Sequence, residues 1–455
     1  MESKNKLFDS FEFVSSKMWK QHIQYELKGA DYNEKLVWES SDGIKVRPFY
    51  HFDENITNCN VNTNATNFKI LQQIFVFDEQ KSNKKALDTL QRGAQSISFT
   101  IEKETISIEK LLQNIPFEQV ICFFNISFLS IDLVNRLTNF AKKHQANFII
   151  QIDPIHHLLK TGNYFTNLET DLKNFNQLVL ATHLPIITIK SGIYQNAGAT
   201  IVQQLAYTLA HANEYFNQLE NYNIPITIEV AIGPNYFFEI AKLRALNLLF
   251  NTLAKEYNHN QPCIIVATPS KRNKTIYDYN VNMQRTTTEC MSAILGGAQF
   301  ISNLPYDALY HKDNEFGDRI SRNQLLILKN ESYLDKVNNP ADGSYYIETL
   351  TQQLSEKALD LFKDIEKNGG LISQLKAGTI QRKINESAQK EQELFDTGKE
   401  VLLGTNKYPN QSDFMKHDLE LYPFVKQNGR KTSISPVIEK RLAEKIEQER
   451  LKFEE

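Results

Sequence analysis

Cysteine is scarce in this sequence, and its spacing excludes two common uses of the residue. The 455 residues include four cysteines, Cys59, Cys122, Cys263 and Cys290, and no two of them form a C-x-x-C pair. Structural zinc sites and thioredoxin-like redox sites need such close pairs. Cys122, Cys263 and Cys290 lie in apolar stretches, so we expect them to be buried thiols that pack like small hydrophobic side chains.

A long apolar run and an excess of positive charge are also missing. The most apolar stretch, 120–129, is interrupted by Asn125 and is about half the length that crosses a bilayer. Residues 1–6 contain no apolar signal core. The formal net charge is −3, which gives no electrostatic basis for binding nucleic acid or an acidic membrane. These features predict a cytoplasmic protein with no nucleic-acid partner and no membrane partner.

Two nucleotide-binding fingerprints are absent as well. No G-x-G-x-x-G follows the first predicted strand, 70–77, and no G-x-x-x-x-G-K-[ST] occurs in the sequence. The first motif holds a dinucleotide pyrophosphate at a helix N-terminus, and the second cradles nucleotide phosphates. Their absence argues against an open Rossmann sheet and against a P-loop enzyme.

What the sequence does contain is a regular alternation of short apolar segments and helical patterns. The predicted strands are 70–77, 96–101, 120–126, 148–152, 186–189, 226–231, 264–267 and 300–304. Apolar strands without alternation are typical of a parallel sheet that is buried on both faces. Eight such units predict an α/β fold, a (β/α)₈ TIM barrel, with an N-terminal extension and a C-terminal helical tail.

We expect three regions along the chain: an N-terminal extension (1–60), the barrel (61–330) and a C-terminal helical region (331–455) that packs on the barrel. In the extension, 11–27 has helical spacing, 36–46 resembles a small hairpin, and 60–67 resembles a polar linker. Trp19, Trp38, Phe49 and Tyr50 are large groups for such a segment. We expect them to dock on the chain's own core or to wrap a partner.

The segment 277–348 is the most strongly patterned part of the sequence. A helical face ends at Gly296 and Gly297, a short strand follows, and 316–329 predicts a second helix that carries Arg319 and Arg322. Beyond it, 350–365 and 380–395 predict amphipathic helices, and 433–455 ends in a charged helix.

Several segments resemble the methylmalonyl-CoA mutase family. They are 280–286 (N-V-N-M-Q-R-T), 296–299 (G-G-A-Q), 318–323 (D-R-I-S-R-N), 339–348 (N-P-A-D-G-S-Y-Y-I-E) and 403–409 (L-G-T-N-K-Y-P). Two others, 27–32 (L-K-G-A-D-Y) and 85–94 (K-A-L-D-T-L-Q-R-G-A), resemble the family's small, non-catalytic subunit in particular. The resemblance extends over nearly the whole chain.

The resemblance implies a radical isomerase that consists of two parts. In catalytic members, a (β/α)₈ barrel takes acyl-CoA along its axis, and a flavodoxin-like domain holds adenosylcobalamin through a D-x-H-x-x-G motif. The reaction interconverts (R)-methylmalonyl-CoA and succinyl-CoA, in propionate metabolism. The cofactor supplies the radical chemistry, and the protein supplies orientation and shielding.

This chain departs from the catalytic pattern at the cobalamin motif. None of its ten histidines has Asp two positions before it, so D-x-H-x-x-G is absent. Residues 415–455 are too few for a doubly wound domain. We therefore expect no cofactor-binding residue on this chain, and adenosylcobalamin in the complex to be held by a partner subunit.

The acyl-CoA site departs from the family pattern too. Where catalytic subunits have a Tyr-His pair after the fifth strand, this chain has Gly192 and Ile193, and Tyr194 lies one position late. A Gln-Thr-Ser-Gly run is replaced by 267–270 (A-T-P-S), and an R-Q-Y-A-G-F segment has no match near 78–83. Gly192 and Ile193 cannot donate or accept through their side chains. We expect no catalytic residue here.

Other polar groups admit a functional and a structural interpretation. His156 and His157 follow the fourth strand, on the face where barrels keep their sites, but a third metal ligand is not evident. We expect no metal site. Arg285 and Arg319 could bind phosphate, although structural salt bridges are the simpler interpretation.

The sequence thus predicts the small, non-catalytic subunit of a heterodimeric methylmalonyl-CoA mutase, which stabilises a catalytic large subunit. As a subunit, it would belong to an isomerase, and alone it would be inactive. Two alternatives stay open. The chain could be an acyl-CoA-binding half-enzyme that a cobalamin-binding domain on another chain completes, or a mutase chaperone or other binding module.

Overall fold

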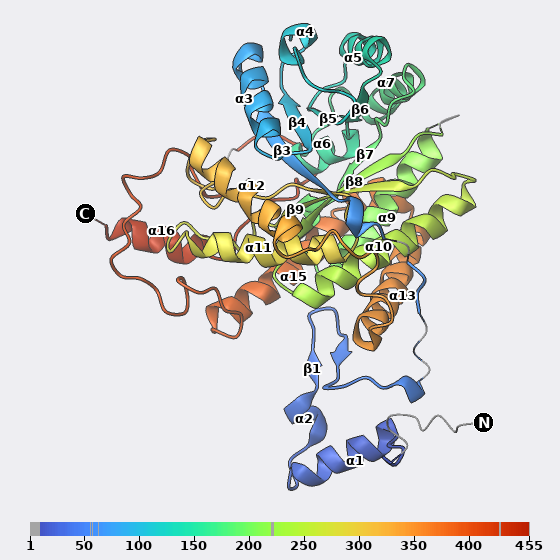
Figure 1. Cartoon of the computed structure of the whole chain (residues 1–455), viewed down its shortest axis with the longest axis vertical. Helices are drawn as coiled ribbons and strands as arrows, with labels where there is room; N and C mark the ends of the chain where they lie inside the picture. Colours follow the sequence, from blue (N-terminus) through green and yellow to red (C-terminus); the bar gives the residue numbers. More distant parts are fainter. Residues whose placement is uncertain are drawn as a thin grey trace, which may run out of the picture.

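Eight parallel strands form the centre of the molecule in the computed structural model (Figure 1). The structure describes residues 10–54, 56, 58–61, 63–219, 223–426 and 429–454, so the polar start at 1–6 lies outside it. The strands are β3 (Lys69–Phe75), β4 (Ser96–Ile101), β5 (Ile121–Ile126), β6 (Asn147–Gln151), β7 (Thr188–Lys190), β8 (Ile226–Ile232), β9 (Cys263–Pro269) and β10 (Phe300–Ile301). Each overlaps a predicted strand, although β10 has two residues where the sequence predicts five.

The sheet closes on itself. Its strand order is β6-β5-β4-β3-β10-β9-β8-β7, and a parallel bridge between Ile152 and Ile187 joins the two outer strands. The Ile150 amide donates to the Pro185 carbonyl at 2.8 Å across the same seam. The predicted (β/α)₈ barrel is therefore confirmed.

Helices surround the barrel because one side of every strand is apolar. Phe99, Phe124 and Phe148 point outward into one large core shared with the helices. The covering helices are α3 (Glu79–Gln91), α4 (Ile108–Leu111), α5 (Ile131–His144), α6 (Pro154–Thr161), α7 (Leu168–Leu180), α8 (Gly192–Asn196), α9 (Ile201–Gln218), α10 (Tyr236–Glu256), α11 (Val281–Leu295) and α12 (Glu315–Asn330). Most begin at a polar cap: the Ser130 hydroxyl, for example, accepts from the Leu133 amide at 3.1 Å.

The C-terminal region consists of α13 (Tyr345–Lys367), α14 (Gly370–Lys376), α15 (Thr379–Asp396) and α16 (Glu444–Lys452). Helix α13 packs on α9 and α10 through Leu350, Leu354 and Ala358, as its periodicity predicts. Gly369 and Gly370 follow it with φ of +97° and +82°, a conformation that glycine adopts without strain.

The charged helix predicted at the end of 433–455 is present as α16, which begins at Glu444. The residues before it, 433–441, are not helical and run over the barrel. The Val437 amide donates to the Leu159 carbonyl at 2.8 Å, and the Lys440 amide donates to the Asn196 carbonyl at 3.0 Å. These bonds to other segments replace those of a helix.

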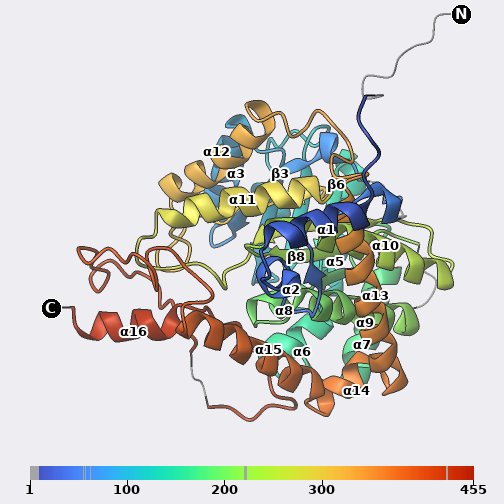
Figure 2. The same ribbon diagram turned by 90° about the horizontal axis from the view of Figure 1, so that it is seen from below.

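The N-terminal extension projects from the barrel as an arm, which we define as residues 10–54 (Figures 1 and 2). It contains α1 (Ser16–Glu26), α2 (Tyr32–Leu36), the predicted hairpin of β1 (Trp38–Glu39) and β2 (Lys45–Val46), and the 3₁₀ turn η1 (Phe52–Glu54). A second 3₁₀ turn, η2 (Ala65–Asn67), leads into β3. Within the described part of the chain, no helix is long and apolar enough to cross a membrane.

Candidate functional site at the barrel mouth

Apolar side chains fill the barrel interior at one level. Parallel neighbours in register face the same side of a sheet, and five inward residues form a cluster separate from the outer core: Leu71, Phe123, Ile149, Val266 and Phe300. The rings of Phe123 and Phe300 meet edge to face, with centroids 4.8 Å apart. We call these five residues the plug, because they occupy the axis along which a barrel ligand would pass.

Three inward hydroxyl groups lie beside the plug. Register pairs Leu71 with Ser96, and Thr188 with Thr227, so these side chains face the interior. Ser96, Thr188 and Thr227 are fully buried, and their hydroxyl oxygens have no hydrogen-bond partner among the described residues. Leaving a buried hydroxyl without a hydrogen-bond partner costs about 1–3 kcal/mol. The apolar side chains of the plug cannot provide such a partner, so this cost offsets part of the stability that their packing gives.

A polar layer lies above the plug, toward the carboxyl ends of the strands. The Lys190 ammonium donates to the Asn125 side-chain oxygen at 2.6 Å, and the Gln151 amide donates to the Glu229 carboxylate. These four residues, which we call the mouth cluster, come from β5, β6, β7 and β8. Burial raises the pKa of Glu229, and the nearby Lys190 charge opposes that rise. TIM barrels carry their active sites at this end.

Asp153 lies beside the mouth cluster, just beyond the carboxyl end of β6. One of its oxygens accepts from His211 Nε2 at 3.0 Å and from the Tyr215 hydroxyl at 2.6 Å, and the other accepts from the Lys190 amide at 2.8 Å. Burial opposes ionisation of Asp153, but His211 and these hydrogen bonds hold its pKa well below the usual range. Its oxygens are committed to α6, α9 and β7, which makes Asp153 a structural carboxylate.

The segment 192–196, where the resemblance places the missing Tyr-His pair, forms α8 next to the mouth. Ile193 is buried, and a Cβ added to Gly192 would lie 3.4 Å from the Ala231 nitrogen. Tyr194 is fully buried, with its ring centroid 5.4 Å from that of Tyr207. Tyr194 therefore packs in the outer core.

The two other departures from the family pattern have structural surroundings. Ala267 is buried in the outer core, and the Ser270 hydroxyl donates to the Asn196 side chain at 2.8 Å. In the 78–83 segment, Asp78 caps α3 through the Lys81 amide, and Asn83 donates to the Leu111 carbonyl at 2.8 Å. The hydrogen bonds of these polar groups stabilise neighbouring helices and loops of this chain.

The histidines near the mouth have protein partners. His156 Nδ1 lies 3.3 Å from the Lys190 carbonyl, and burial lowers its pKa to about 3. His157 stacks on Phe165 with centroids 3.8 Å apart, and His211 is fully buried against Asp153. Among the described residues, no group of three His, Cys, Asp or Glu side chains could hold a metal ion. Because protein groups engage each of these histidines, they do not fit a role as cobalamin ligands.

The two arginines considered for phosphate binding make other contacts. Arg285 donates to the Asn282 side chain and to the Leu403 carbonyl, both at 2.8 Å, so it joins α11 to the C-terminal region through hydrogen bonds. Among the described residues it forms no salt bridge, in contrast to the simpler interpretation of the sequence. The Arg319 guanidinium lies 5.5 Å from the centre of the Phe316 ring. Neither contact forms a phosphate cradle.

The 339–348 motif is a clasp for the linker that precedes the barrel. Glu348 accepts from Arg244 Nη2 at 2.8 Å and from the Cys59 amide at 3.0 Å, and the Thr63 amide donates to the Asn339 side chain at 2.6 Å. The predicted polar linker is thus tied to the segment that precedes α13, and Ala65 in η2 is fully buried.

Sequence reasoning missed Arg244 and the mouth cluster. Asn125 interrupts an apolar run of the sequence. Lys190 is the last residue of β7, and Glu229 lies in the middle of β8. Polar residues at inward positions of buried strands were the available signal. Their grouping depends on strand register, which an apolar pattern leaves open.

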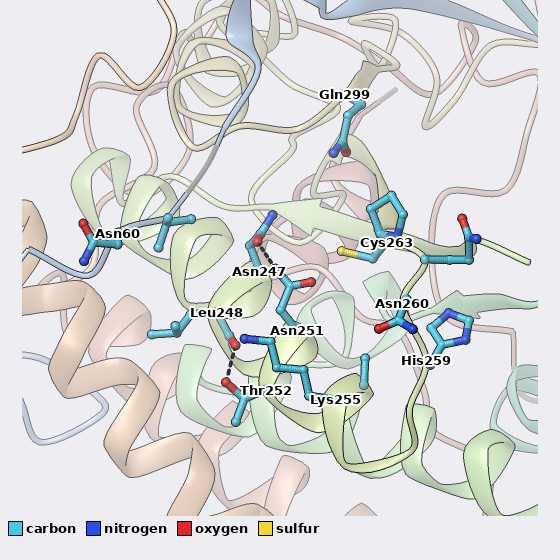
Figure 3. Close-up of a pocket in the computed structure, with 14 residues that line it drawn as sticks. Asn60, Asn247, Leu248, Asn251, Thr252, Lys255, His259, Asn260, Cys263 and Gln299 are labelled. Carbon is cyan, nitrogen blue, oxygen red and sulfur yellow. Dashed lines mark hydrogen bonds between the residues drawn. The ribbon is translucent and has the colours of Figure 1, made fainter. Parts of the chain in front are cut away.

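A surface cavity lies at the opposite end of the barrel (Figure 3). Its volume is about 510 Å³, and Cys263, the first residue of β9, and Gln299, just before β10, line it. Asn247 and Asn251 on α10 face it, joined by a 2.7 Å hydrogen bond. Along β9, the plug residue Val266 follows Cys263 of this cavity, and along β5 the plug residue Phe123 precedes Asn125 of the mouth cluster.

Comparison with known proteins identifies the family. The methylmalonyl-CoA mutase family model matches residues 100–452. The chain is 33% identical to the methylmalonyl-CoA mutase small subunit of Porphyromonas gingivalis, over 90% of this chain and 72% of that protein. It is 36% identical to the methylmalonyl-CoA mutase of Rhizobium meliloti over 49% of this chain, and 27% identical to that of Cereibacter sphaeroides over 86%.

The match covers only 33% and 64% of the lengths of the last two proteins. The family model spans more than half of the chain, and the small-subunit relative is matched along most of its length. The chain belongs to the methylmalonyl-CoA mutase family.

Proposed function

We propose that this chain is the small, non-catalytic subunit of an adenosylcobalamin-dependent methylmalonyl-CoA mutase. In the complex, a catalytic large subunit would bind both the acyl-CoA and the cofactor, and this chain would stabilise it. The whole heterodimer would be an isomerase that interconverts (R)-methylmalonyl-CoA and succinyl-CoA in the cytoplasm, as part of propionate metabolism. No catalytic, cofactor-binding or metal-binding residue is assigned to this chain.

The plug is the observation that carries this proposal. An acyl-CoA that followed the barrel axis would have to pass the level of Phe123 and Phe300, whose rings are in contact. Both side chains are buried, so their displacement would expose apolar surface and leave a cavity. A barrel whose interior is packed with apolar side chains suits a subunit that binds a partner through its outer surface.

The loss of donors at the mouth supports the same proposal. Gly192 and Ile193 stand where catalytic subunits have a Tyr-His pair, and neither can hydrogen-bond a thioester carbonyl through its side chain. Tyr194 is buried in the outer core, so it does not replace the missing pair. The name of the Porphyromonas gingivalis relative, a small subunit, agrees with a partner of larger size.

The half-enzyme alternative has one observation in its favour. The mouth cluster places Lys190 and Glu229 at the end of the barrel where a substrate acyl group would bind. A half-enzyme would still need a path for the pantetheine chain, and the plug occupies that path. The small-subunit proposal is therefore the better supported one.

Two experiments test the proposal. Co-purification with the large mutase subunit should give a stable complex, and its absence would contradict the partnership. Calorimetry of this chain with succinyl-CoA should detect no heat of binding. A saturable heat would instead support the half-enzyme. A chaperone would dissociate from the mature enzyme during size-exclusion chromatography, whereas a subunit should stay bound.

A further inference from the structure

The cavity in Figure 3 has the size of a small-molecule site and takes no part in the proposed function. Its volume is about 510 Å³, and small-molecule sites usually measure about 300–1,000 Å³. Helix α10, the loop before β9, and Asn60 and Val61 of the linker line it. It lies at the amino-terminal ends of β9 and β10, away from the mouth where TIM barrels keep their catalytic groups.

The side chains that line this cavity are rich in amides. Among the described lining residues there is one lysine, Lys255, and there is no Asp, Glu, Phe, Tyr or Trp. A carboxamide offers both donors and an acceptor, so it can pair with a group that also donates and accepts. Six of the lining residues are carboxamides: Asn60, Asn247, Asn251, Asn260, Gln261 and Gln299.

Helix α10 presents a polar stripe to the cavity. Asn247, Asn251 and Lys255 follow one another at four-residue intervals, which places them on one face of the helix (Figure 3). The Asn251 amide donates to the Asn247 side-chain oxygen at 2.7 Å. This bond leaves the Asn251 oxygen and the Asn247 amide without a partner among the described residues. Lys255 forms no ion pair within the described part of the chain.

Gln299 adds a donor whose position is set by the barrel. Its Oε1 accepts from the Ile265 amide at 2.6 Å, and its backbone carbonyl accepts from the Lys69 amide at 2.9 Å. These bonds to β9 and β3 leave Nε2 beside the cavity with no hydrogen-bond partner among the described residues (Figure 3). A donor that is already fixed loses little conformational entropy when a ligand binds.

The lining excludes several classes of ligand. An apolar chain would bury carboxamides without hydrogen-bond partners, which costs free energy. A nucleobase or a flavin ring would find no aromatic side chain to stack on among the described lining residues. A cation would meet Lys255 and no lining carboxylate from the described chain. A molecule with several hydroxyl groups and a negative charge matches both the carboxamides and the ammonium group.

We propose that this cavity binds a small hydroxyl-rich anion, of the class of sugar phosphates and sugar acids. The Lys255 ammonium pairs with the anionic group, Asn247 and Asn251 bind hydroxyl groups, and Gln299 Nε2 donates to an oxygen of the ligand. The site lies on this chain alone, so the inference does not depend on the proposed subunit role. The ligand is not a reactant of the mutase, because the cavity is at the opposite end of the barrel from the mouth.

Isothermal titration calorimetry of the purified chain tests the site with named probes. Glucose 6-phosphate, ribose 5-phosphate and gluconate carry hydroxyl groups and a negative charge, whereas glucose carries hydroxyl groups alone and inorganic phosphate carries charge alone. At least one of the first three should bind saturably, with one site per chain and at least about tenfold more tightly than glucose or phosphate. No saturable heat from all three, or an equal affinity for glucose or for phosphate, would overturn the proposal.

Variants of α10 locate the binding. Asn251→Leu and Lys255→Met change exposed side chains, and each should weaken binding of the tightest probe by at least about tenfold, since each removes a hydrogen-bonding group. Asn139→Leu and Lys143→Met are the matched controls, because they remove an exposed asparagine and an exposed lysine, also four positions apart, from α5. These controls lie outside the cavity lining and should change the affinity by less than about twofold.

Gln299→Glu tests the sign of the charge that the cavity accepts. This variant keeps an acceptor for the Ile265 amide and replaces the Nε2 donors with a charged oxygen. It should unfold at the wild-type temperature and lose the binding of the anionic probe. Wild-type affinity in Gln299→Glu, or in both α10 variants, would overturn the assignment to this cavity. Because the readout is binding by this chain alone, a failure here is distinct from a failure to bind the large subunit.

Discussion

Arg244 and Glu348 form a buried ion pair that joins the barrel to the rest of the chain. Arg244 is fully buried in α10, and its Nη2 donates to Glu348 of α13 at 2.8 Å. The other oxygen of Glu348 accepts from the Cys59 amide at 3.0 Å. A single carboxylate thus holds a barrel helix, the C-terminal region and the linker from the arm. Burial, followed by the negative charge of Glu348, raises the pKa of Cys59 to about 11.

We predict that Glu348→Gln destabilises the protein by about 3 kcal/mol, because a buried guanidinium then lacks one of its charge partners. Asp342, which also pairs with Arg244 at 2.8 Å, limits the loss. Urea unfolding measures the change. The control is Arg382→Gln, which removes an exposed pair with Glu386 and should cost less than about 1 kcal/mol. Similar small losses in both variants would contradict the structural role of Glu348.

Removing a ring from the plug should leave a cavity. Phe123→Ala should lower the free energy of unfolding by about 3–5 kcal/mol, since Phe123 is fully buried against Phe300. Phe75→Ala is the matched control: Phe75 also lies on a barrel strand, as the last residue of β3, but it is 46% exposed, so a loss below about 1 kcal/mol is expected. A small loss at Phe123 would show that the barrel is not packed along its axis.

The stability of the C-terminal region should depend on pH through His311. Its Nδ1 lies 3.2 Å from Asp307 and its Nε2 lies 3.3 Å from Asp418, which joins the loop after β10 to the C-terminal region. Burial lowers the pKa of His311, but the two carboxylates outweigh burial and raise it above 6.5. The stabilisation is therefore complete below pH 6.5 and is lost as the pH rises through the folded-state pKa.

His311→Gln should remove this dependence. Urea unfolding between pH 5.5 and 8.5 should show wild-type stability falling with rising pH more steeply than that of the variant. His417→Gln, at an exposed position nearby, should leave the wild-type slope unchanged. A His311→Gln slope equal to that of the wild type would mean that the imidazole does not hold this contact.

The mouth cluster should be dispensable for turnover by the complete mutase. Lys190→Met and Glu229→Gln remove its two charges, and the complex should keep its kcat and KM within about threefold. A group that transfers a proton or orients the substrate would cost about 100-fold or more. A loss of that size, with the heterodimer intact by size-exclusion chromatography, would favour the half-enzyme.

The sequence predicted the barrel well because its strands are buried on both sides. Runs such as the one around Phe123 and Phe124 are apolar on consecutive residues, so their position is evident without knowledge of register. The role of Phe123 in the plug, in contrast, depends on which face each residue takes. That is decided by pairing with Ser98 and by ring closure, which local patterns do not encode.

The aromatic residues of the arm were predicted to dock, but the surface could not be chosen. Trp38 packs against Phe238 of the barrel helix α10 with ring centroids 5.6 Å apart, whereas Trp19 touches Phe49 within the arm, and both tryptophans stay about half exposed, at 51% and 46%. Both tryptophans occupy similar sequence surroundings. Ile44, at the tip of the β1-β2 hairpin, is buried in the main core and attaches the arm to the barrel. This tertiary contact decides which tryptophan reaches a barrel helix.

We propose that this chain supports a mutase without performing its chemistry. The direct measurement is the turnover of (R)-methylmalonyl-CoA to succinyl-CoA by the purified chain with adenosylcobalamin, beside the complex with the large subunit. We predict turnover by the complex and no turnover above background by the chain alone. Turnover by the isolated chain would contradict the account.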